Sequence, residues 1–209
     1  MPKTRLTRKE RERQRRKEEI LVAASNLFST KGFHNVSMQE IARASEFAVG
    51  TLYNFFKSKD ALFDEMARVC SERVVSVLSS IIDGPGSEVE RLRAFIRYQP
   101  QLLEEHGDFI KLYVSQLGQR SHKLAQMQKE NSPSKVLDSK VEQLIKAGLD
   151  KSMFRPVDPA IAAKAILSTM ETIAFETAEL VDKAELTDIS RKVEQLFIDG
   201  LLMPEGAGQ

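Results

Sequence analysis

The residues best suited to chemistry lie close together in the first third of the chain. Tyr53, Asn54, Lys57 and Lys59 offer a hydroxyl, an amide and two ammonium groups within one short segment. These groups donate hydrogen bonds to phosphate oxygens, and the amide also suits a base edge. No phosphate-binding loop, G-x-S-x-G or HExxH motif occurs. The segment therefore favours contact with nucleic acid over catalysis.

Residues that hold metals or act as nucleophiles are few and scattered. The chain has three histidines, His34, His106 and His122, and none is at metal-ligand spacing with another. Cys70 is the only cysteine, and it lies in a helical apolar stretch. We therefore expect no enzyme, no metal site and no cofactor. Detected turnover of any substrate would revive the enzyme alternative.

The net charge of +1 hides a strongly basic N-terminus. Residues 1–17 contain nine Lys or Arg and two Glu, a net charge of +7, so the remainder carries −6. Such a block is typical of nucleic-acid binding, although a solvated tail and a contact with anionic lipid are alternatives. We expect Arg13, Arg15, Arg16 and Lys17 to add salt-sensitive attraction to DNA, with the minor groove within their reach.

The composition is that of an ordinary soluble protein, with 42% hydrophobic and 29% charged residues in 209. No apolar run is long enough to span a membrane, and the charged N-terminus lacks the apolar core of a secretory signal. The single cysteine permits no intramolecular disulfide, which fits a reducing cytoplasm. We expect a cytoplasmic protein without a membrane partner.

The spacing of apolar residues is helical almost throughout and predicts an all-α protein. A first helix is expected from about Arg13 to Thr30, ended at Gly32. Ser37 to Glu40 forms a capping box that predicts the start of a second helix. After a turn near Ser45 to Phe47, a third helix is expected over residues 48–55. The residues expected to face inward from the second and third helices are Ile41, Ala44, Leu52 and Phe56.

The later part of the chain is also expected to be helical. A Gly/Pro cluster at residues 83–86 is the clearest break. Pro100 should kink or divide the helix that follows. Residues 118–134 fit either a helix extension or a loop. The expected helices after the break are Ser87–Glu105, Asp108–Leu117, Ser134–Lys151, one that opens at Asp158-Pro159, and Thr187–Leu202.

Residues Ile20 to Leu62 resemble the N-terminal domain of the TetR family of bacterial transcription regulators. The matching segments are LFSTKGF, SMQEIA and GTLYNFFKSKDAL. The resemblance implies a three-helix helix-turn-helix domain at 18–61, after a basic tail at 1–17, and a helical dimerisation and effector domain at 62–209. It also implies a homodimer on a palindromic double-stranded operator, at the bacterial nucleoid. Two departures are Glu46, where the family usually has Gly, and Ala48, where it usually has Ser or Thr.

The candidate DNA contacts divide into two groups by chemistry. For phosphates they are Ser37, Thr51, Tyr53, Lys57 and Lys59; for base edges they are Gln39, Val49, Gly50 and Asn54. The family position supports Tyr53, Lys59 and Gln39. A core aromatic is the alternative for Tyr53, a pure helix cap for Ser37, and close helix packing for Gly50.

The second half offers weaker signals for a ligand and a partner copy. The candidate pocket residues are Phe95, Tyr98, Phe109, Tyr113, Phe175 and Glu171, the last of which could meet a cationic effector. The candidate dimer residues are Ile166, Met170, Ile173, Phe197 and Leu201, because a helix apolar on more than one face must be buried on more than one side. Monomer core is the alternative for both sets.

The patterns favour a transcription regulator, most simply a repressor released by a small apolar or cationic ligand. A DNA-binding organiser of the same fold, working through a protein partner without a small effector, is the second hypothesis. The operator, the effector and the regulated genes do not follow from the residues.

Overall fold

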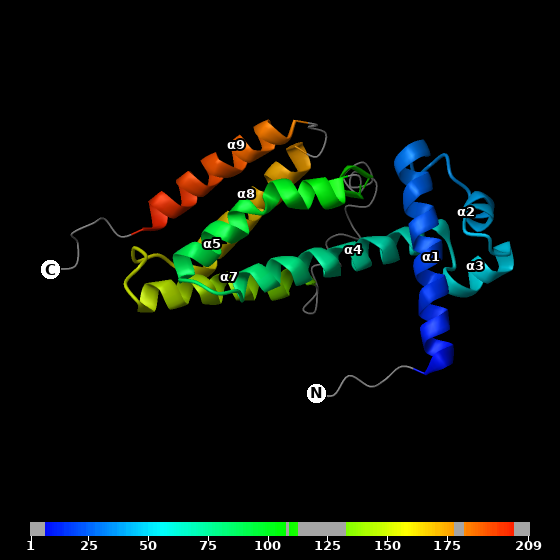
Figure 1. Cartoon of the computed structure of the whole chain (residues 1–209), viewed down its shortest axis with the longest axis horizontal. Coiled ribbons are helices and arrows are strands. Elements are labelled where there is room, and N and C mark those ends of the chain that lie inside the picture. Colours follow the sequence, from blue (N-terminus) through cyan, green and yellow to red (C-terminus); the bar gives the residue numbers. More distant parts are fainter. Residues whose placement is uncertain (1–6, 108, 113–132, 178–181, 203–209) are drawn as a thin grey trace. The chain divides into compact units, whose positions relative to one another are not determined.

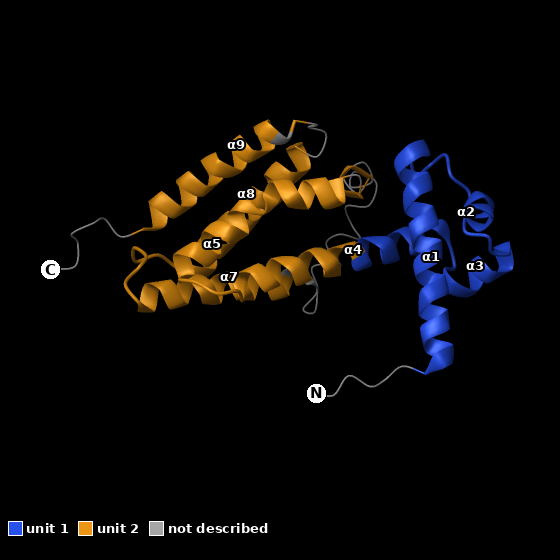
Figure 2. Ribbon diagram, viewed as in Figure 1, with its two compact units in different colours: residues 1–69 blue, residues 70–209 orange. Residues whose placement is uncertain are grey.

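The computed structural model describes residues 7–107, 109–112, 133–177 and 182–202. Every regular element within them is a helix, which confirms the predicted all-α class (Figure 1). The chain divides into two compact units, Met1–Val69 and Cys70–Gln209 (Figure 2). None of the described helices is long and apolar enough to cross a membrane.

α1 (Arg8–Lys31) is longer than the apolar pattern predicted. The Thr7 hydroxyl accepts a hydrogen bond from the Glu10 N–H at 3.2 Å, and the Glu10 carboxylate accepts one from the Thr7 N–H at 2.7 Å. This capping box starts the helix ahead of its apolar stripe, so the expected start near Arg13 is wrong. Gly32, with a φ of 79°, ends the helix as predicted.

One stripe of α1 builds the core of the first unit. Ile20, Ala24 and Phe28 are each at most 1% exposed. The ring of Phe28 lies 5.2 Å from that of Phe33 and 6.3 Å from that of Phe63, centroid to centroid. These aromatic contacts hold the chain after α1 against the start of α4 (Lys59–Ile82).

α2 (Met38–Ala44) and α3 (Val49–Phe55) form the predicted helix-turn-helix. The expectation that Ala44 faces inward is wrong, because it is exposed while Ala42 is 1% exposed. Positions 38, 41 and 42 make one helical stripe, and position 44 lies off it. The buried residues of the two helices are Met38, Ile41, Ala42 and Leu52.

The second unit contains the remaining helices. They are α5 (Glu88–Arg97), α7 (Pro133–Asp150), α8 (Pro159–Thr177), α9 (Lys183–Glu194) and a π-helical turn (Gln195–Asp199), and residues 99–107 and 109–112 are also helical. α7 and α8 begin near the predicted positions. α9 begins before the predicted Thr187, because the Asp182 carboxylate accepts from the Ala184 N–H at 2.8 Å. The predicted features at residues 113–132 lie outside the described residues.

Pro100 divides the predicted helix in two, between α5 and the helix of residues 99–107. Proline has no N–H to donate to the carbonyl of Ile96, four residues earlier. The Ser190 hydroxyl of α9 donates to that carbonyl at 3.1 Å in a buried position. The Ile96 carbonyl at the helix break thus forms a hydrogen bond that joins α5 to α9.

Three residues expected at a dimer interface lie in the core of the single chain. Ile166 is 0% exposed, and Met170 and Leu201 are each 7% exposed. A side chain already buried has almost no area left to bury against a partner, so the interface role is corrected to a core role for these three. Ile173 and Phe197 are half-buried against the same core.

Candidate nucleic-acid interface

α3 buries one side and exposes the other. Leu52 is 0% exposed and anchors the helix, whereas Tyr53 is 49% exposed and Asn54 is also exposed. Val49 and Thr51 are half-buried at the edge of the exposed side. The core-aromatic alternative for Tyr53 is therefore excluded, and these four candidate DNA residues share one accessible helix with a fifth, Gly50.

Gly50 has open space around it. A Cβ added to Gly50 would meet no atom within 4 Å. Close helix packing, the alternative reason for a glycine here, is therefore excluded within the part of the chain that the structure describes. The bare backbone of α3 is free to approach a base edge at this position.

The turn before α3 holds a residue in the left-handed conformation. Glu46 has a φ of 59°, at a cost of about 1–2 kcal/mol for a residue with a side chain. Ala48 precedes α3 without a side-chain cap, a further loss of about 1 kcal/mol. The turn still closes, because the Phe47 N–H donates to the Ala42 carbonyl at 3.0 Å. The two departures noted in the sequence thus correspond to a left-handed non-glycine residue and an uncapped helix start.

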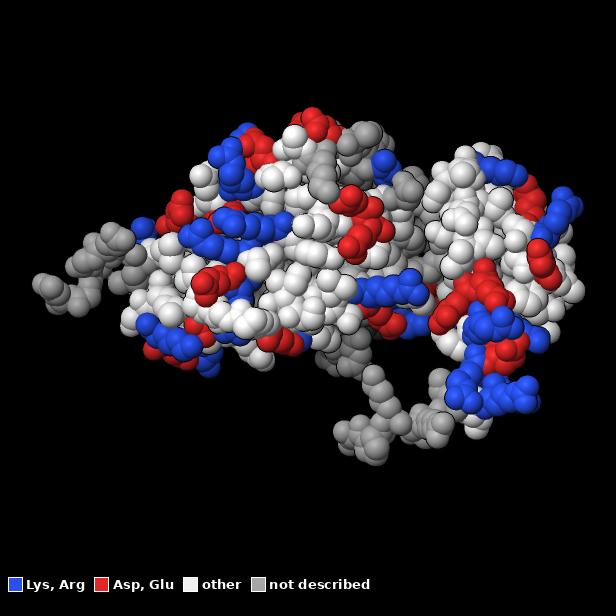
Figure 3. All heavy atoms as spheres, in the orientation of Figure 1, with Lys and Arg blue, Asp and Glu red and all other residues white. Residues whose placement is uncertain are grey.

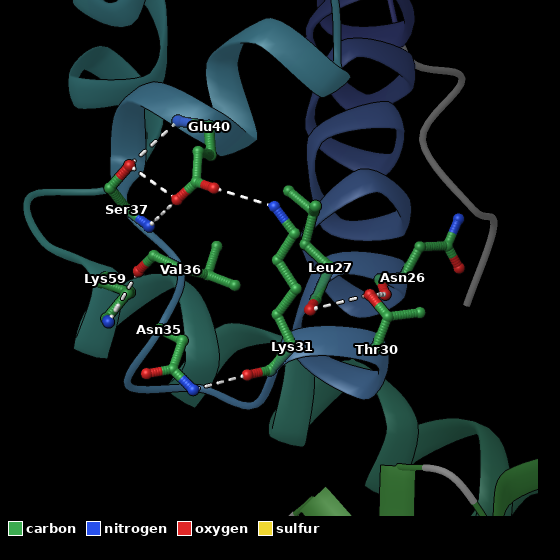
Figure 4. A network of polar contacts seen from close by, with 9 residues as sticks. All are labelled: Asn26, Leu27, Thr30, Lys31, Asn35, Val36, Ser37, Glu40 and Lys59. Atoms are coloured by element: carbon green, nitrogen blue, oxygen red, sulfur yellow. Dashed lines mark hydrogen bonds and ion pairs between the residues drawn. The ribbon is translucent and has the colours of Figure 1, made fainter.

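Ser37 and Glu40 satisfy each other at the start of α2 (Figure 4). The Ser37 hydroxyl accepts from the Glu40 N–H at 3.2 Å and donates to the Glu40 carboxylate at 3.0 Å, and the Lys31 ammonium donates to the same carboxylate at 3.0 Å. Hydrogen bonds from the Ser37 N–H and from Lys31 lower the pKa of Glu40 to about 2. Since the Ser37 proton is engaged, its predicted phosphate contact requires the hydroxyl to turn away. Gln39 is exposed beside it.

Lys59 is engaged with the chain that precedes α2. Its Nζ donates to the carbonyl oxygens of Phe33 at 2.7 Å and Val36 at 2.8 Å, with a longer contact of 3.4 Å to that of His34. It also lies 4.5 Å from the centroid of the Phe33 ring. The predicted phosphate contact of Lys59 therefore competes with bonds inside the protein.

The end of α3 lies beside the basic part of α1. The Arg13 guanidinium stands 5.7 Å from the centroid of the Phe55 ring, a cation–π contact. Lys57, two residues further along, is exposed. Sequence reasoning did not anticipate the Arg13–Phe55 contact, because nothing in the spacing links residues so far apart.

Ion pairs divide the basic residues of α1 into two groups. Arg15, Arg16 and Lys17 each pair with a glutamate at 2.5 to 3.0 Å. Those without an ion pair among the described residues are Arg8, Lys9, Arg11 and Arg13. Figure 3 shows blue spheres gathered at the N-terminal end of α1, with red spheres further along it. Of the four cations predicted to attract DNA, Arg13 thus has no ion pair among the described residues, whereas Arg15, Arg16 and Lys17 are each paired with a glutamate.

The residues predicted to line an effector pocket lie in different environments. Phe95 is 1% exposed within the core, whereas Tyr98, Phe109 and Phe175 are half-buried. Tyr113 lies outside the described residues. The structure thus places Phe95 among ordinary core residues and leaves three aromatic side chains in partly covered positions.

Glu171 has an acidic neighbour on another helix. Burial of part of its side chain raises the pKa of Glu171, and the Asp138 carboxylate of α7 adds to the effect. Burial also raises the pKa of Asp138, although Lys164 and Lys135 offset part of the rise. A cationic group at this place would stabilise both carboxylates.

Sequence reasoning missed Gln99, which is 3% exposed. Its Nε2 donates to the Met170 carbonyl at 3.1 Å, and its Oε1 is buried without a partner within the described residues. A buried acceptor that lacks a donor costs about 1–3 kcal/mol. Gln99 is therefore, with Glu88, one of two residues of the second unit with a buried side-chain oxygen that accepts no hydrogen bond within the described residues.

Two family models match the chain. The model described as "Bacterial regulatory proteins, tetR family" matches residues 20–66, and the model described as "Tetracyclin repressor-like, C-terminal domain" matches residues 85–175. Together they cover the helix-turn-helix and much of the second unit.

Similar proteins include transcription regulators over nearly the whole chain. The uncharacterized HTH-type transcriptional regulator YhgD of Bacillus subtilis is 24% identical over 188 residues, 89% of this chain and 96% of its own. The FadR structure from Bacillus subtilis, in complex with stearoyl-CoA, has a TM-score of 0.73 at 20% identity, covering 88% and 98%. The ketosteroid transcriptional regulator KstR2 of Mycobacterium tuberculosis has a TM-score of 0.65 at 17% identity, covering 90% and 96%.

Proposed function

The chain belongs to the TetR family of bacterial regulatory proteins, and on that premise we propose that it is a homodimeric repressor of transcription. It binds a palindromic operator through α3 and leaves it when a small molecule occupies the second unit. The observation that carries this proposal is the exposed side of α3, where Gly50, Tyr53 and Asn54 are accessible on a helix anchored by Leu52.

The two groups of contacts have separate roles in this proposal. Tyr53 and Lys57 bind phosphates and set the register, with Thr51 and Ser37 as further hydroxyl donors. The base edges are read by Val49, Gly50, Asn54 and Gln39. The unpaired cations at the start of α1 add attraction that is independent of sequence.

The proposed effector is apolar and donates a hydrogen bond. Two similar structures are named for stearoyl-CoA and for ketosteroid, both of which contain a large apolar part. The unpartnered Gln99 Oε1 supports a donor group on the ligand. Such an effector releases DNA only if it binds the conformation with wrongly spaced recognition helices more tightly than the DNA-competent one.

Binding to fragmented chromosomal DNA of the host tests the proposal. We expect enriched fragments that share a palindrome whose half-sites lie one helical turn, or a multiple of it, apart. Long-chain acyl-CoA and steroid series are then titrated onto the complex, and one series should release the DNA. No enriched fragment would contradict the proposal. Many sites without release by any metabolite extract would support the organiser instead.

A further inference from the structure

Lys59 joins the two ends of the helix-turn-helix. Its side chain starts at the residue that opens α4, just after α3, and its ammonium reaches Phe33 and Val36, just before α2. Figure 4 shows Lys59 beside the Val36 carbonyl. The segment that carries α2 and α3 is therefore closed on itself by one side chain.

The ammonium has no proton left over for a phosphate in this arrangement. A lysine ammonium carries three protons, and three carbonyl oxygens surround Nζ at 2.7, 2.8 and 3.4 Å. The Phe33 ring, 4.5 Å away, covers a further side of the charge. A direct phosphate contact would require Lys59 to give up one of these carbonyls. Lys57 is exposed and would not have to break such bonds to reach a phosphate.

The loop that Lys59 holds is fixed from its other side as well. The Asn35 side-chain amide donates to the Lys31 carbonyl at 2.9 Å, and Lys31 pairs with Glu40 of α2 at 3.0 Å. Phe33 and Val36 are 6% and 2% exposed. The loop is thus bonded to α1 by Asn35 and to α4 by Lys59, while the Lys31–Glu40 ion pair joins α1 to α2.

We infer that Lys59 is a positioning residue for DNA binding, which acts by fixing residues 33–36 and through them the placement of α2 and α3. This inference rests on the proposed DNA contact of α3. When Lys59 is replaced, we expect weaker DNA binding because α3 is then misplaced. The Lys59 ammonium does not itself bind a phosphate.

The first test uses the protein without DNA. In Lys59→Met, the amides of residues 34–37 should exchange with solvent roughly ten- to hundredfold faster, because hydrogen bonds from a charged donor are removed. Lys57→Met removes the same charge two residues away and should leave these amides unchanged. Circular dichroism must show both variants folded at the assay temperature. Unchanged exchange in Lys59→Met would overturn the inference, whatever becomes of operator and effector.

The second test uses a duplex selected by the native protein from a random DNA library. Lys59→Met should bind this duplex at least about tenfold more weakly at every salt concentration. The slope of log K against log salt should fall by less than about 0.9, which is the change expected when one phosphate contact is lost. Lys59→Arg keeps the charge but replaces three convergent protons with a planar fork, so it should not restore native affinity. Native affinity in Lys59→Arg, or a slope lowered by one full phosphate with unchanged loop exchange, would show a direct contact. Unchanged affinity in a folded Lys59→Met would show a purely structural role.

Discussion

Gly50 illustrates how a single residue separates binding from stability. It lies within α3, where a glycine costs stability relative to alanine, and nothing surrounds its missing Cβ. Gly50→Ala should therefore raise the free energy of unfolding by about 0.5–1 kcal/mol and weaken DNA binding, because a methyl group would stand between the backbone and the bases. Chemical denaturation and titration of the selected duplex measure the two effects.

Gly107 provides the matched control for that substitution. It is also helical, and an added Cβ would meet no atom of the described residues within 4 Å, but it lies in the second unit. Gly107→Ala should gain similar stability and bind DNA as the native protein does. Equal DNA affinity in Gly50→Ala and native protein would count against a close backbone approach at α3.

Glu40 links the stability of the first unit to pH. Its pKa falls from a usual value near 4.5 to about 2 in the folded chain, through the Ser37 N–H and Lys31. A depressed pKa stabilises the folded state above pH 4.5, and this contribution is lost as the pH falls towards 2. The difference in stability between native protein and Glu40→Gln should therefore shrink over that range. A difference independent of pH in denaturant titrations would contradict the pKa.

For single residues, burial and exposure along a helix could be predicted from the sequence, whereas partners far away in the chain could not. The exposure of Tyr53 and Asn54 and the burial of Leu52 follow from helical spacing alone. The partners of Lys59 are main-chain carbonyls 23 to 26 positions away, and a carbonyl leaves no mark in the sequence. Chemistry indicated the charge of Lys59 but could not indicate how the folded chain uses it.

At the scale of elements, α1 combines a core helix with a charged extension. Arg8 and Arg11 have no ion pair among the described residues, whereas Arg15 and Arg16 pair with Glu12. The double variant Arg8→Gln and Arg11→Gln should lower the salt slope of DNA binding by about 0.9 for each phosphate that the variant no longer neutralises. Binding titrations at several salt concentrations measure it.

Arg15→Gln with Arg16→Gln is the control, since it removes the same charge from residues already neutralised by glutamates. Its slope should stay closer to the native value. Equal changes in the two double variants would mean that the ion pairs do not select which cations meet DNA.

The contact between α5 and α9 depends on one hydroxyl. Ser190 is 3% exposed and supplies the donor that Pro100 cannot give to the Ile96 carbonyl. Ser190→Ala removes this buried hydrogen-bond donor from the Ile96 carbonyl and should lower the free energy of unfolding by about 1–3 kcal/mol. Denaturant unfolding of the whole chain measures the loss. Ser76→Ala, at an exposed position of α4, should change stability little, and an equal loss there would remove the significance of the bond.

The helices themselves were predictable to differing degrees. The break at Pro100 followed from its missing N–H, but the Ser190 partner did not, because it comes from a helix far along the chain. The start of α1 is marked by the capping box of Thr7 and Glu10, but the apolar stripe does not indicate it, because the stripe begins only at Ile20. Capping signals and core signals locate different parts of one helix.

At the scale of the molecule, a dimer needs apolar surface that the single chain leaves open. Ile161 of α8 is 70% exposed and Leu196 of the π-helical turn is 68% exposed. If these two side chains meet a second copy, the double variant Ile161→Glu and Leu196→Glu should be a folded monomer where the native protein is a dimer, because charged side chains cannot be buried unpaired. Sedimentation at micromolar concentration measures the state. A native monomer would contradict the proposed homodimer, and a variant dimer would place the interface elsewhere.

The structure of the first unit was easier to predict than that of the second, because its motif lies in one short segment of sequence. A capping box, a turn and a short reading helix lie within 27 residues of one another, from Val36 to Leu62. The second unit depends on packing between helices distant in sequence, so apolar spacing alone did not separate core residues such as Ile166 from surface residues such as Ile161.

The charged extension of α1 has a consequence for how solution conditions act. No residue from Arg8 to Lys17 is buried, so side-chain pairs such as Arg15–Glu19 and Gln14–Glu18, at 3.0 and 2.9 Å, support the helix there. Salt weakens such exposed ion pairs while it also competes with the protein for phosphates. Salt should therefore change the conformation of the free protein as well as weaken its binding to DNA. The helicity of the free protein should fall as the salt concentration rises.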